Sequence, residues 1–191
     1  MRGCFYSNQC GSKYKRLKTV TATKLVNKKL KKGTYYKYLI VAVDKAGYEA
    51  AGITEVPTTL AEIAAIAEQL TSVEGNPQYA MGLSIYGWFF EALLVGSGHY
   101  YVDNENGRVA PATKIEYDTN GGGKMVMEAW KDLVDSGVCF NYGIDNDSAK
   151  SGFMAGDTAI TFESTAQLTT ITNGASFEVG AAMLPSVLEE R

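Results

Sequence analysis

Apolar residues in the second part of the chain recur at helical spacing, in blocks separated by short apolar runs. Residues 59–62 (TLAE) form a capping box, in which the Thr59 hydroxyl and the Glu62 carboxylate satisfy amides of the first turn. Apolar residues then follow at every third or fourth position up to Leu70. The same reasoning predicts helices at 87–96, 120–137, 148–156 and 164–172, and short strands at 79–85, 157–162 and 177–184. This alternation predicts an α/β lobe, with helices on a short-stranded sheet.

The first part of the chain has a different pattern, in which aromatic and β-branched residues roughly alternate with polar ones. Strands are predicted at 13–20, 22–26 and 34–44, with a loop at 27–33 between the last two. Lys and Tyr alternate in the last of these strands, as expected for a strand with one face in solvent. A small antiparallel β segment is therefore expected before the α/β lobe.

Charge divides the chain at the same place. Residues 1–46 carry twelve Lys and Arg against one acid, Asp44, whereas the remainder carries six bases and twenty acids. The two parts have formal charges of +11 and -14, which together give the -3 of the whole chain. Such a change of sign predicts two units, a basic β segment at 1–46 and an acidic unit at 47–191. The lysines at 24–37 alternate with strand residues, which favours a solvated sheet face over a nucleic-acid site.

The basic segment resembles part of a fibronectin type III-like module. Its stretch LKKGTYYKYLIVAVDKAG has Leu30, Gly33 and Thr34 at a tight corner, Tyr36 as the corner tyrosine, and then a long strand. The resemblance covers about residues 13–47 and supplies roughly three of the seven strands of such a sandwich. The residues DKAGYEAAGI at 44–53 are typical of either unit, so the join between the two units is predicted there.

Several function classes lack their sequence signals. Cys4, Cys10 and Cys139 have no metal-ligand spacing, and Cys139 is expected to act as a small apolar residue. Asp145-Asn146-Asp147 lacks the order of a calcium loop, so neither a metal nor a cofactor is expected. His99 has no nucleophile partner in a recognised motif, and no enzymatic activity is expected. No secretory signal and no apolar run long enough to cross a membrane is visible.

Between about residue 46 and residue 185, six segments follow one another in a recognisable order: VPTTLAEIAAIAEQL, IYGWFFEALLVGSG, ENGRVAPAT, MEAWKDLVDSG, FMAGDTAITFESTAQL and FEVGAAMLP. Through these segments the chain resembles the extracytoplasmic solute-binding proteins of ABC importers, in the branch that binds glycerol 3-phosphate and sugars. The resemblance implies a periplasmic-binding-protein-like fold, in which two lobes close on a solute and deliver it to a membrane permease. It also implies an extracytoplasmic location. The chain matches mainly the second lobe.

Four residues are candidates for ligand contact. Trp88 lies at a strand-to-helix turn, where its ring can cover the apolar face of a sugar, and Gly87 would let the backbone approach the ligand. Ser164 and Thr165 follow a strand at a helix start, where they could contact a ligand or cap the helix. Trp88, Ser164 and Thr165 match residues that line the cleft in the resembling family. Glu163 stands where that family often has a small or hydroxyl residue, which makes an anionic ligand less expected.

The family's first lobe is not recognisable before residue 48, where the basic segment stands instead. A site with about half its contacts is expected to bind at millimolar concentration or more weakly, rather than at micromolar concentration. The predicted function is therefore capture of a sugar or glycerol-phosphate-type solute for import, impaired in this truncated chain. Two alternatives stay open: a surface module that adheres to polysaccharide or protein, and a non-functional hybrid reading frame.

Overall fold

The computed structural model describes residues 3–7, 15–20 and 39–188 of the chain. Seven strands lie in these ranges: β1 (Gly3–Ser7), β2 (Lys15–Val20), β3 (Leu39–Asp44), β4 (Tyr79–Leu83), β5 (Cys139–Asn141), β6 (Thr158–Ser164) and β7 (Val179–Ala182). The helices are α1 (Lys45–Ala50), α2 (Leu60–Thr71), α3 (Gly87–Gly96), α4 (Asp103–Gly107), α5 (Gly122–Asp135), α6 (Asn146–Ala155), the 3-10 turn η1 (Thr165–Gln167) and α7 (Leu168–Gly174).

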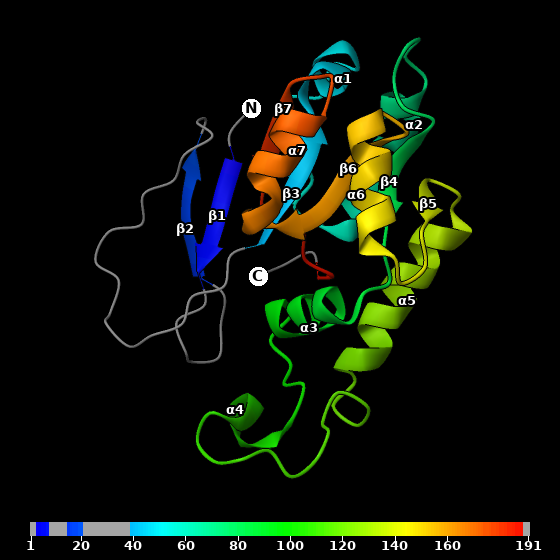
Figure 1. The fold of residues 1–191 in the computed structure, drawn as a ribbon. Coiled ribbons are helices and arrows are strands. Elements are labelled where there is room, and N and C mark those ends of the chain that lie inside the picture. Colours follow the sequence, from blue (N-terminus) through cyan, green and yellow to red (C-terminus); the bar gives the residue numbers. More distant parts are fainter. Residues whose placement is uncertain (1–2, 8–14, 21–38, 189–191) are drawn as a thin grey trace.

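Within the described residues, five strands form one sheet in the order β5-β4-β6-β3-β7. β4 runs parallel to both β5 and β6, whereas β3 pairs antiparallel with β6 and β7. β1 and β2 form a separate antiparallel pair beside the β7 end of this sheet (Figure 1). The α/β architecture with a small antiparallel β segment before it is thus the predicted one, and that prediction is confirmed.

Helices cover both faces of the five-stranded sheet (Figure 1). The larger core lies between the sheet and the helices α2, α3 and α5, and it contains Val41 and Val43 of β3 together with Phe89 and Trp130. A smaller core lies on the other face, where Ala42 of β3 packs with Phe153 of α6 and Ile171 of α7. Neighbouring residues of β3 point to opposite faces because side chains alternate along a strand. All of β3 from Ile40 to Val43 is therefore buried.

Most of the predicted helices are present, because their local signals agree with the tertiary structure. At α2, the Thr59 side chain accepts a hydrogen bond from the Glu62 amide at 3.1 Å, and Glu62 accepts one from the Thr59 amide at 3.3 Å. α3 has the predicted limits, 87–96. α5 and α6 lie within or close to the predicted ranges, and the predicted helix at 164–172 is divided into η1 and α7.

The join at residues 44–53 contains a helix that sequence reasoning did not predict. Asp44 caps α1 by accepting a hydrogen bond from the Gly47 amide at 3.0 Å. Tyr48 is fully buried in the larger core. Side chains of the acidic unit hold the segment in place, because Asn76 donates to the Gly47 carbonyl at 3.1 Å and Gln69 donates to the Ala51 carbonyl at 2.7 Å. Residues 44–53 are therefore packed against the α/β lobe and are not a loose linker.

Several sequence predictions fall outside the described residues. These are the strand at 22–26, the loop at 27–33, and the corner residues Leu30, Gly33, Thr34 and Tyr36 of the fibronectin-like pattern. Of the strand predicted at 34–44, the described part forms β3. Its place between β6 and β7 means that this last strand of the predicted basic segment belongs to the main sheet. The division at residue 46 stays a prediction.

Candidate functional site

The candidate residues lie where the parallel strands end. β4, β5 and β6 are parallel, so their carboxyl ends reach the same edge of the sheet. β4 leads into α3, β5 leads into α6, and β6 leads into η1 (Figure 1). Ligands of open α/β sheets bind outside this edge, because loops and helix starts converge there. Trp88 and Ser164 come to this edge from different strands, since they follow β4 and β6.

The start of α3 presents the ring of Trp88 and the backbone amide groups of an uncapped first turn. Trp88 is half-buried and stacks on Phe89 with a centroid distance of 5.8 Å and an interplanar angle of 25°. The first turn of α3 has no side-chain cap from Tyr86. Gly87 is exposed, and a Cβ placed there would meet nothing within 4 Å. The first turn of this helix can therefore donate backbone hydrogen bonds to an oxygen atom that approaches from outside.

Ser164 and Thr165 begin the turn that follows β6. The Ser164 hydroxyl accepts a hydrogen bond from the Ala166 amide at 3.2 Å, so it caps η1. Both residues are half-buried. The capping role expected for Ser164 is thus present, and ligand contact by Ser164 and Thr165 stays a prediction.

A polar pocket of about 340 Å³ opens beside Trp88. A hydrogen-bonded chain leads from buried Ser84 to this pocket, because the Ser84 hydroxyl donates to the side-chain Oδ1 of Asn146 at 2.8 Å and the side-chain Nδ2 of Asn146 donates to Glu163 at 2.7 Å. Glu163 is 4% exposed and also accepts from the Ser164 amide at 2.8 Å. The lining residues of this polar pocket are Tyr86, Trp88, Ile144, Asp145, Asn146, Asp147, Lys150, Glu163 and Gln167.

Charged side chains surround the polar pocket at the start of α6. Asp145 caps α6 and accepts from the Ser148 amide at 3.0 Å and from the Ser148 hydroxyl at 2.6 Å. The hydroxyl and then the amide of Ser148 lower the pKa of Asp145, so this side chain is a carboxylate at neutral pH. Lys150 is paired with Asp147 at 2.6 Å. The pocket thus offers hydrogen-bond donors and acceptors next to one aromatic face.

An aromatic pocket of about 360 Å³ lies on the other side of Tyr86. Tyr101 and Tyr117 stack with centroids 4.9 Å apart, and Phe90 meets Tyr117 edge to face at 5.2 Å. Asp118 and the backbone of Gly87 and Gly123 supply polar atoms. The lining residues of this aromatic pocket are Ile85, Tyr86, Gly87, Phe90, Tyr101, Tyr117, Asp118, Gly123, Met127 and Trp130.

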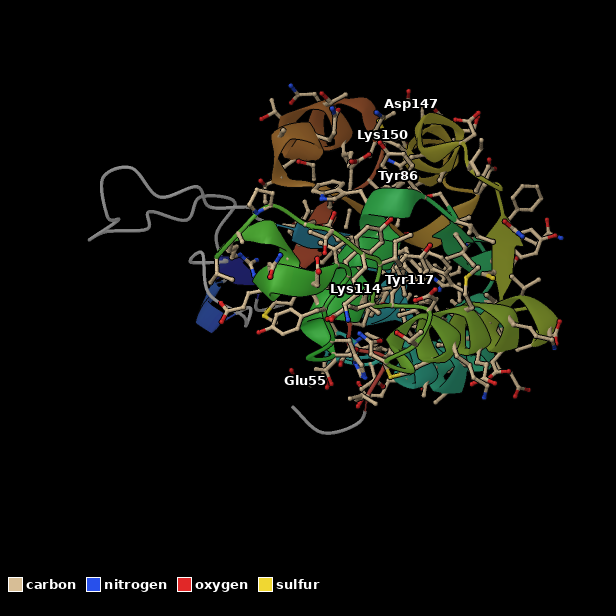
Figure 2. The ribbon with its side chains drawn as sticks, turned by 90° about the horizontal axis from the view of Figure 1, so that it is seen from below. Glu55, Tyr86, Lys114, Tyr117, Asp147 and Lys150 are labelled. Atoms are coloured by element: carbon tan, nitrogen blue, oxygen red, sulfur yellow. The ribbon has the colours of Figure 1, made fainter. Side chains whose placement is uncertain are left out.

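Tyr86 joins the two pockets. It is 43% exposed and lines both pockets, and Figure 2 shows it between the pair Asp147 and Lys150 on one side and Tyr117 on the other. Tyr86 is not among the candidate residues of the sequence analysis. Its exposure follows from its position before α3, outside the helix that buries Phe89.

The sequence-predicted residues are divided between these surfaces. Trp88 lines the polar pocket and Gly87 lines the aromatic pocket. Ser164 and Thr165 line neither, although Glu163 and Gln167 beside them line the polar pocket. Sequence reasoning missed Asn146 and Lys150, because Asp145-Asn146-Asp147 was tested only as a calcium loop. A cap at the start of α6, directly after a short strand, was the signal that could have identified them.

No group of three or more His, Cys, Asp or Glu side chains in the part of the chain that the structure describes could hold a metal ion. None of the helices in the described ranges has the length and the apolar character needed to cross a membrane.

Comparisons with known proteins extend this picture. Many solved structures are similar to this chain, and two of them show the resemblance in fold. The first is the GacH receptor of Streptomyces glaucescens, which was studied unliganded and with acarbose; it is 24% identical with a TM-score of 0.64, over 78% of this chain and 37% of that chain. The second is UgpB from Mycobacterium tuberculosis in complex with glycerophosphocholine; it is 21% identical with a TM-score of 0.60, over 82% of this chain and 39% of that chain.

The present chain thus spans well under half the length of these two proteins. A search of curated proteins finds no match. The profile of one family, described as "Bacterial extracellular solute-binding protein", matches residues 12–189. The match includes most of the basic segment as well as both pockets. Members of this family bind solutes and are not enzymes. The family description places them outside the cytoplasm. The chain belongs to the bacterial extracellular solute-binding protein family.

Proposed function

We propose that this chain captures a sugar or a glycerol-phosphate-type solute and delivers it to the permease of an ABC importer. The observation that carries the proposal is the pair of pockets that share Tyr86 at the carboxyl edge of the parallel strands. Aromatic faces suit the CH face of a pyranose, and the chain of Ser84, Asn146 and Glu163 suits its hydroxyl groups. GacH with acarbose and UgpB with glycerophosphocholine support this class of solute.

The location and partner belong to the same proposal. The permease of an importer would receive the solute outside the cytoplasm, which is the location given in the family description. Within this proposal, residues 47–191 supply mainly one lobe, and residues 1–46 form a basic β segment that resembles part of a fibronectin type III-like module. The position of β3 supports a close structural connection between the two, since this strand contributes to the main sheet.

The affinity of this polypeptide is expected to be low. Both pockets are open surfaces on one lobe, and in two-lobed relatives a second lobe adds contacts by closing over the solute. A micromolar site corresponds to about 8 kcal/mol, and loss of half of this leaves millimolar binding. The 191-residue polypeptide is therefore expected to bind a matching solute with a dissociation constant in the millimolar range.

Calorimetric titration and tryptophan fluorescence with glucose, maltose and glycerol 3-phosphate test the proposal. Saturable binding of at least one solute is expected, together with a change in the fluorescence of Trp88. Trp88→Ala should weaken binding about tenfold or more, because a stacked ring contributes on the order of 1 kcal/mol beyond its buried area. Phe140→Ala, which removes a partly exposed aromatic ring that lines neither pocket, serves as the control.

Two results would contradict parts of this proposal, the first the position of the site and the second its low affinity. Unchanged affinity in Trp88→Ala would place the solute elsewhere. Micromolar binding would show that these 191 residues already form a complete site.

A further inference from the structure

The polar pocket carries an excess of negative charge among its described residues. Three carboxylates line it, Asp145, Asp147 and Glu163, against a single cation, Lys150. That cation is already neutralised, because the Lys150 ammonium lies 2.6 Å from an Asp147 oxygen. The side chain of Lys150 is only 13% exposed, whereas that of Asp147 is 88% exposed. The field inside the pocket is therefore negative.

Glu163 is the most deeply placed of these acids. It is 4% exposed, and neither lysine nor arginine forms an ion pair with it in the described part of the chain. Its two oxygens accept hydrogen bonds, one from the side-chain Nδ2 of Asn146 and the other from the backbone amide of Ser164. Charges interact more strongly in such a buried place than in water. A second negative charge brought close to Glu163 is correspondingly unfavourable.

The place where a phosphate would ordinarily bind is occupied by the chain itself. A helix N-terminus attracts phosphate through its free amides and its dipole. At the N-terminus of α6, the Asp145 carboxylate already accepts from the Ser148 amide, and Asp147 adds a further negative charge in the first turn. The chain's own carboxylates thus fill the anion position of the polar pocket.

We propose that the polar pocket selects uncharged, hydroxyl-bearing solutes and rejects solutes that carry a phosphate group, with Glu163 as the residue that determines this selectivity. The inference rests on the proposed function, since it concerns the solute of the same site. Sugar hydroxyls can donate to the carboxylates and can accept from Asn146, whereas a phosphate dianion can only accept and meets two carboxylates that are not offset by Lys150.

The N-terminus of α3 favours an anionic group, in contrast to the carboxylates of the polar pocket. Its effect is too small to reverse the expected rejection of phosphate. Its first turn has no side-chain cap, and its dipole favours an oxygen atom near Gly87. A hydroxyl or ring oxygen satisfies the same amides without adding charge. The helix contributes about half an elementary charge at this end, which is less than the two unmatched carboxylates.

The experiment compares glucose with glucose 6-phosphate, which differ only by the phosphate group, on the full chain by calorimetric titration. Glucose is expected to bind about tenfold more tightly or better. In Glu163→Gln, the ratio of the affinity for glucose to the affinity for glucose 6-phosphate should fall about fivefold, because the amide lacks the negative charge that opposes the phosphate. Glu55→Gln removes the same charge at an exposed residue that lines neither pocket, and it should change neither affinity. The discrimination should also decrease in high salt, because added ions screen the charges.

Asp147→Asn provides a second variant, because its side chain is exposed and its loss should leave the fold intact. It releases Lys150 and should likewise raise the affinity for glucose 6-phosphate. If the wild-type chain binds the phosphorylated sugar as tightly as glucose, or if both variants leave the discrimination unchanged, the inference is wrong while the proposed function stands. If the chain binds none of glucose, maltose, glucose 6-phosphate and glycerol 3-phosphate, the proposed function itself is wrong and the inference falls with it.

Discussion

At the scale of single residues, the most informative position is Gly87. Its backbone conformation does not require glycine, and a Cβ added there would meet no protein atom within 4 Å. Glycine at this position is thus not explained by packing. A close approach between the backbone at the start of α3 and a ligand, as expected from the sequence pattern, stays a prediction that the following variant tests.

Gly87→Ala is expected to leave stability unchanged or to raise it slightly, because alanine is about 0.5–1 kcal/mol better than glycine in a helix. Solute binding should weaken severalfold, because the methyl group would occupy space used by the ligand. Gly96→Ala is the matched control, since Gly96 ends the same helix and its Cβ would also meet nothing within 4 Å. Thermal unfolding and solute titration of both variants check this prediction, and equal affinities in the two would count against backbone contact at Gly87.

The sequence did not predict the burial or the hydrogen bonds of the acidic residues in the polar pocket. Glu163 was noted in the sequence as a departure at the position before Ser164, but nothing in its neighbours indicated that it is buried. Its burial results from β6 lying in the middle of the sheet, between β4 and β3. Its hydrogen bond to Asn146 joins residues 17 positions apart, a contact that no local pattern specifies.

At the scale of elements, the capping box at the start of α2 is expected to contribute measurably to the free energy of unfolding. Glu62 accepts hydrogen bonds from the Thr58 amide at 2.5 Å, the Thr58 hydroxyl at 3.0 Å and the Thr59 amide at 3.3 Å. The bond from the Thr58 amide is the main cause of the lowered pKa of Glu62. Thr59 contributes the other half of the capping box and is 4% exposed.

A carboxyl group with a lowered pKa in the folded state stabilises the fold when it is ionised. Its contribution is complete above the pKa of the unfolded chain and is lost as the pH falls through the folded pKa. In Glu62→Gln, stability at neutral pH should decrease, and the decline on acidification below about pH 5 should be less steep than in the wild type. Glu74→Gln, at an exposed residue outside any helix, is the control.

Denaturant unfolding between pH 3 and pH 7 measures this difference. Parallel curves for the wild type and Glu62→Gln would contradict the role assigned to the carboxylate. Thr59→Ala should cost about 1 kcal/mol at neutral pH, because it removes the acceptor for the Glu62 amide.

At the scale of the whole molecule, β3 decides whether the acidic unit can fold alone. This strand lies between β6 and β7, and its residues from Ile40 to Val43 are buried on both faces of the sheet. Burial of Ile40, Val41 and Val43 contributes roughly 1.5–3 kcal/mol each. This sum is comparable to the whole stability of a typical domain, about 5–15 kcal/mol.

A polypeptide of residues 47–191 lacks β3 and is therefore expected not to unfold cooperatively. A polypeptide of residues 39–191 retains the strand and is expected to show a cooperative transition, because its five-stranded sheet is complete. Circular dichroism during heating distinguishes the two. A cooperative transition of 47–191 equal to that of 39–191 would show that β3 adds little, and would favour a boundary at residue 46.

The limits of the helices were largely encoded in local sequence. The box at Thr59 and Glu62, the apolar spacing in 87–96 and the stop at Gly137 act within one or two turns, so the sequence alone predicts them. α1 was not predicted, because its capping residue Asp44 ends a strand and its short sequence contains Gly47. Contacts from Gln69 and Asn76 hold it in place, and these depend on α2 already being packed.

The sequence by itself determined the α/β class, the family, and the positions of Trp88 and Ser164 at junctions between a strand and a helix. Those features follow from periodicity, capping and short ordered motifs, which are local properties of the chain. Only the tertiary structure decided that β3 belongs to the main sheet, that Tyr86 is shared by two pockets, and that Glu163, Asn146 and Ser84 form one hydrogen-bonded chain. These features depend on strand order and on contacts between distant residues, because the sheet places side by side segments that are up to about 140 positions apart.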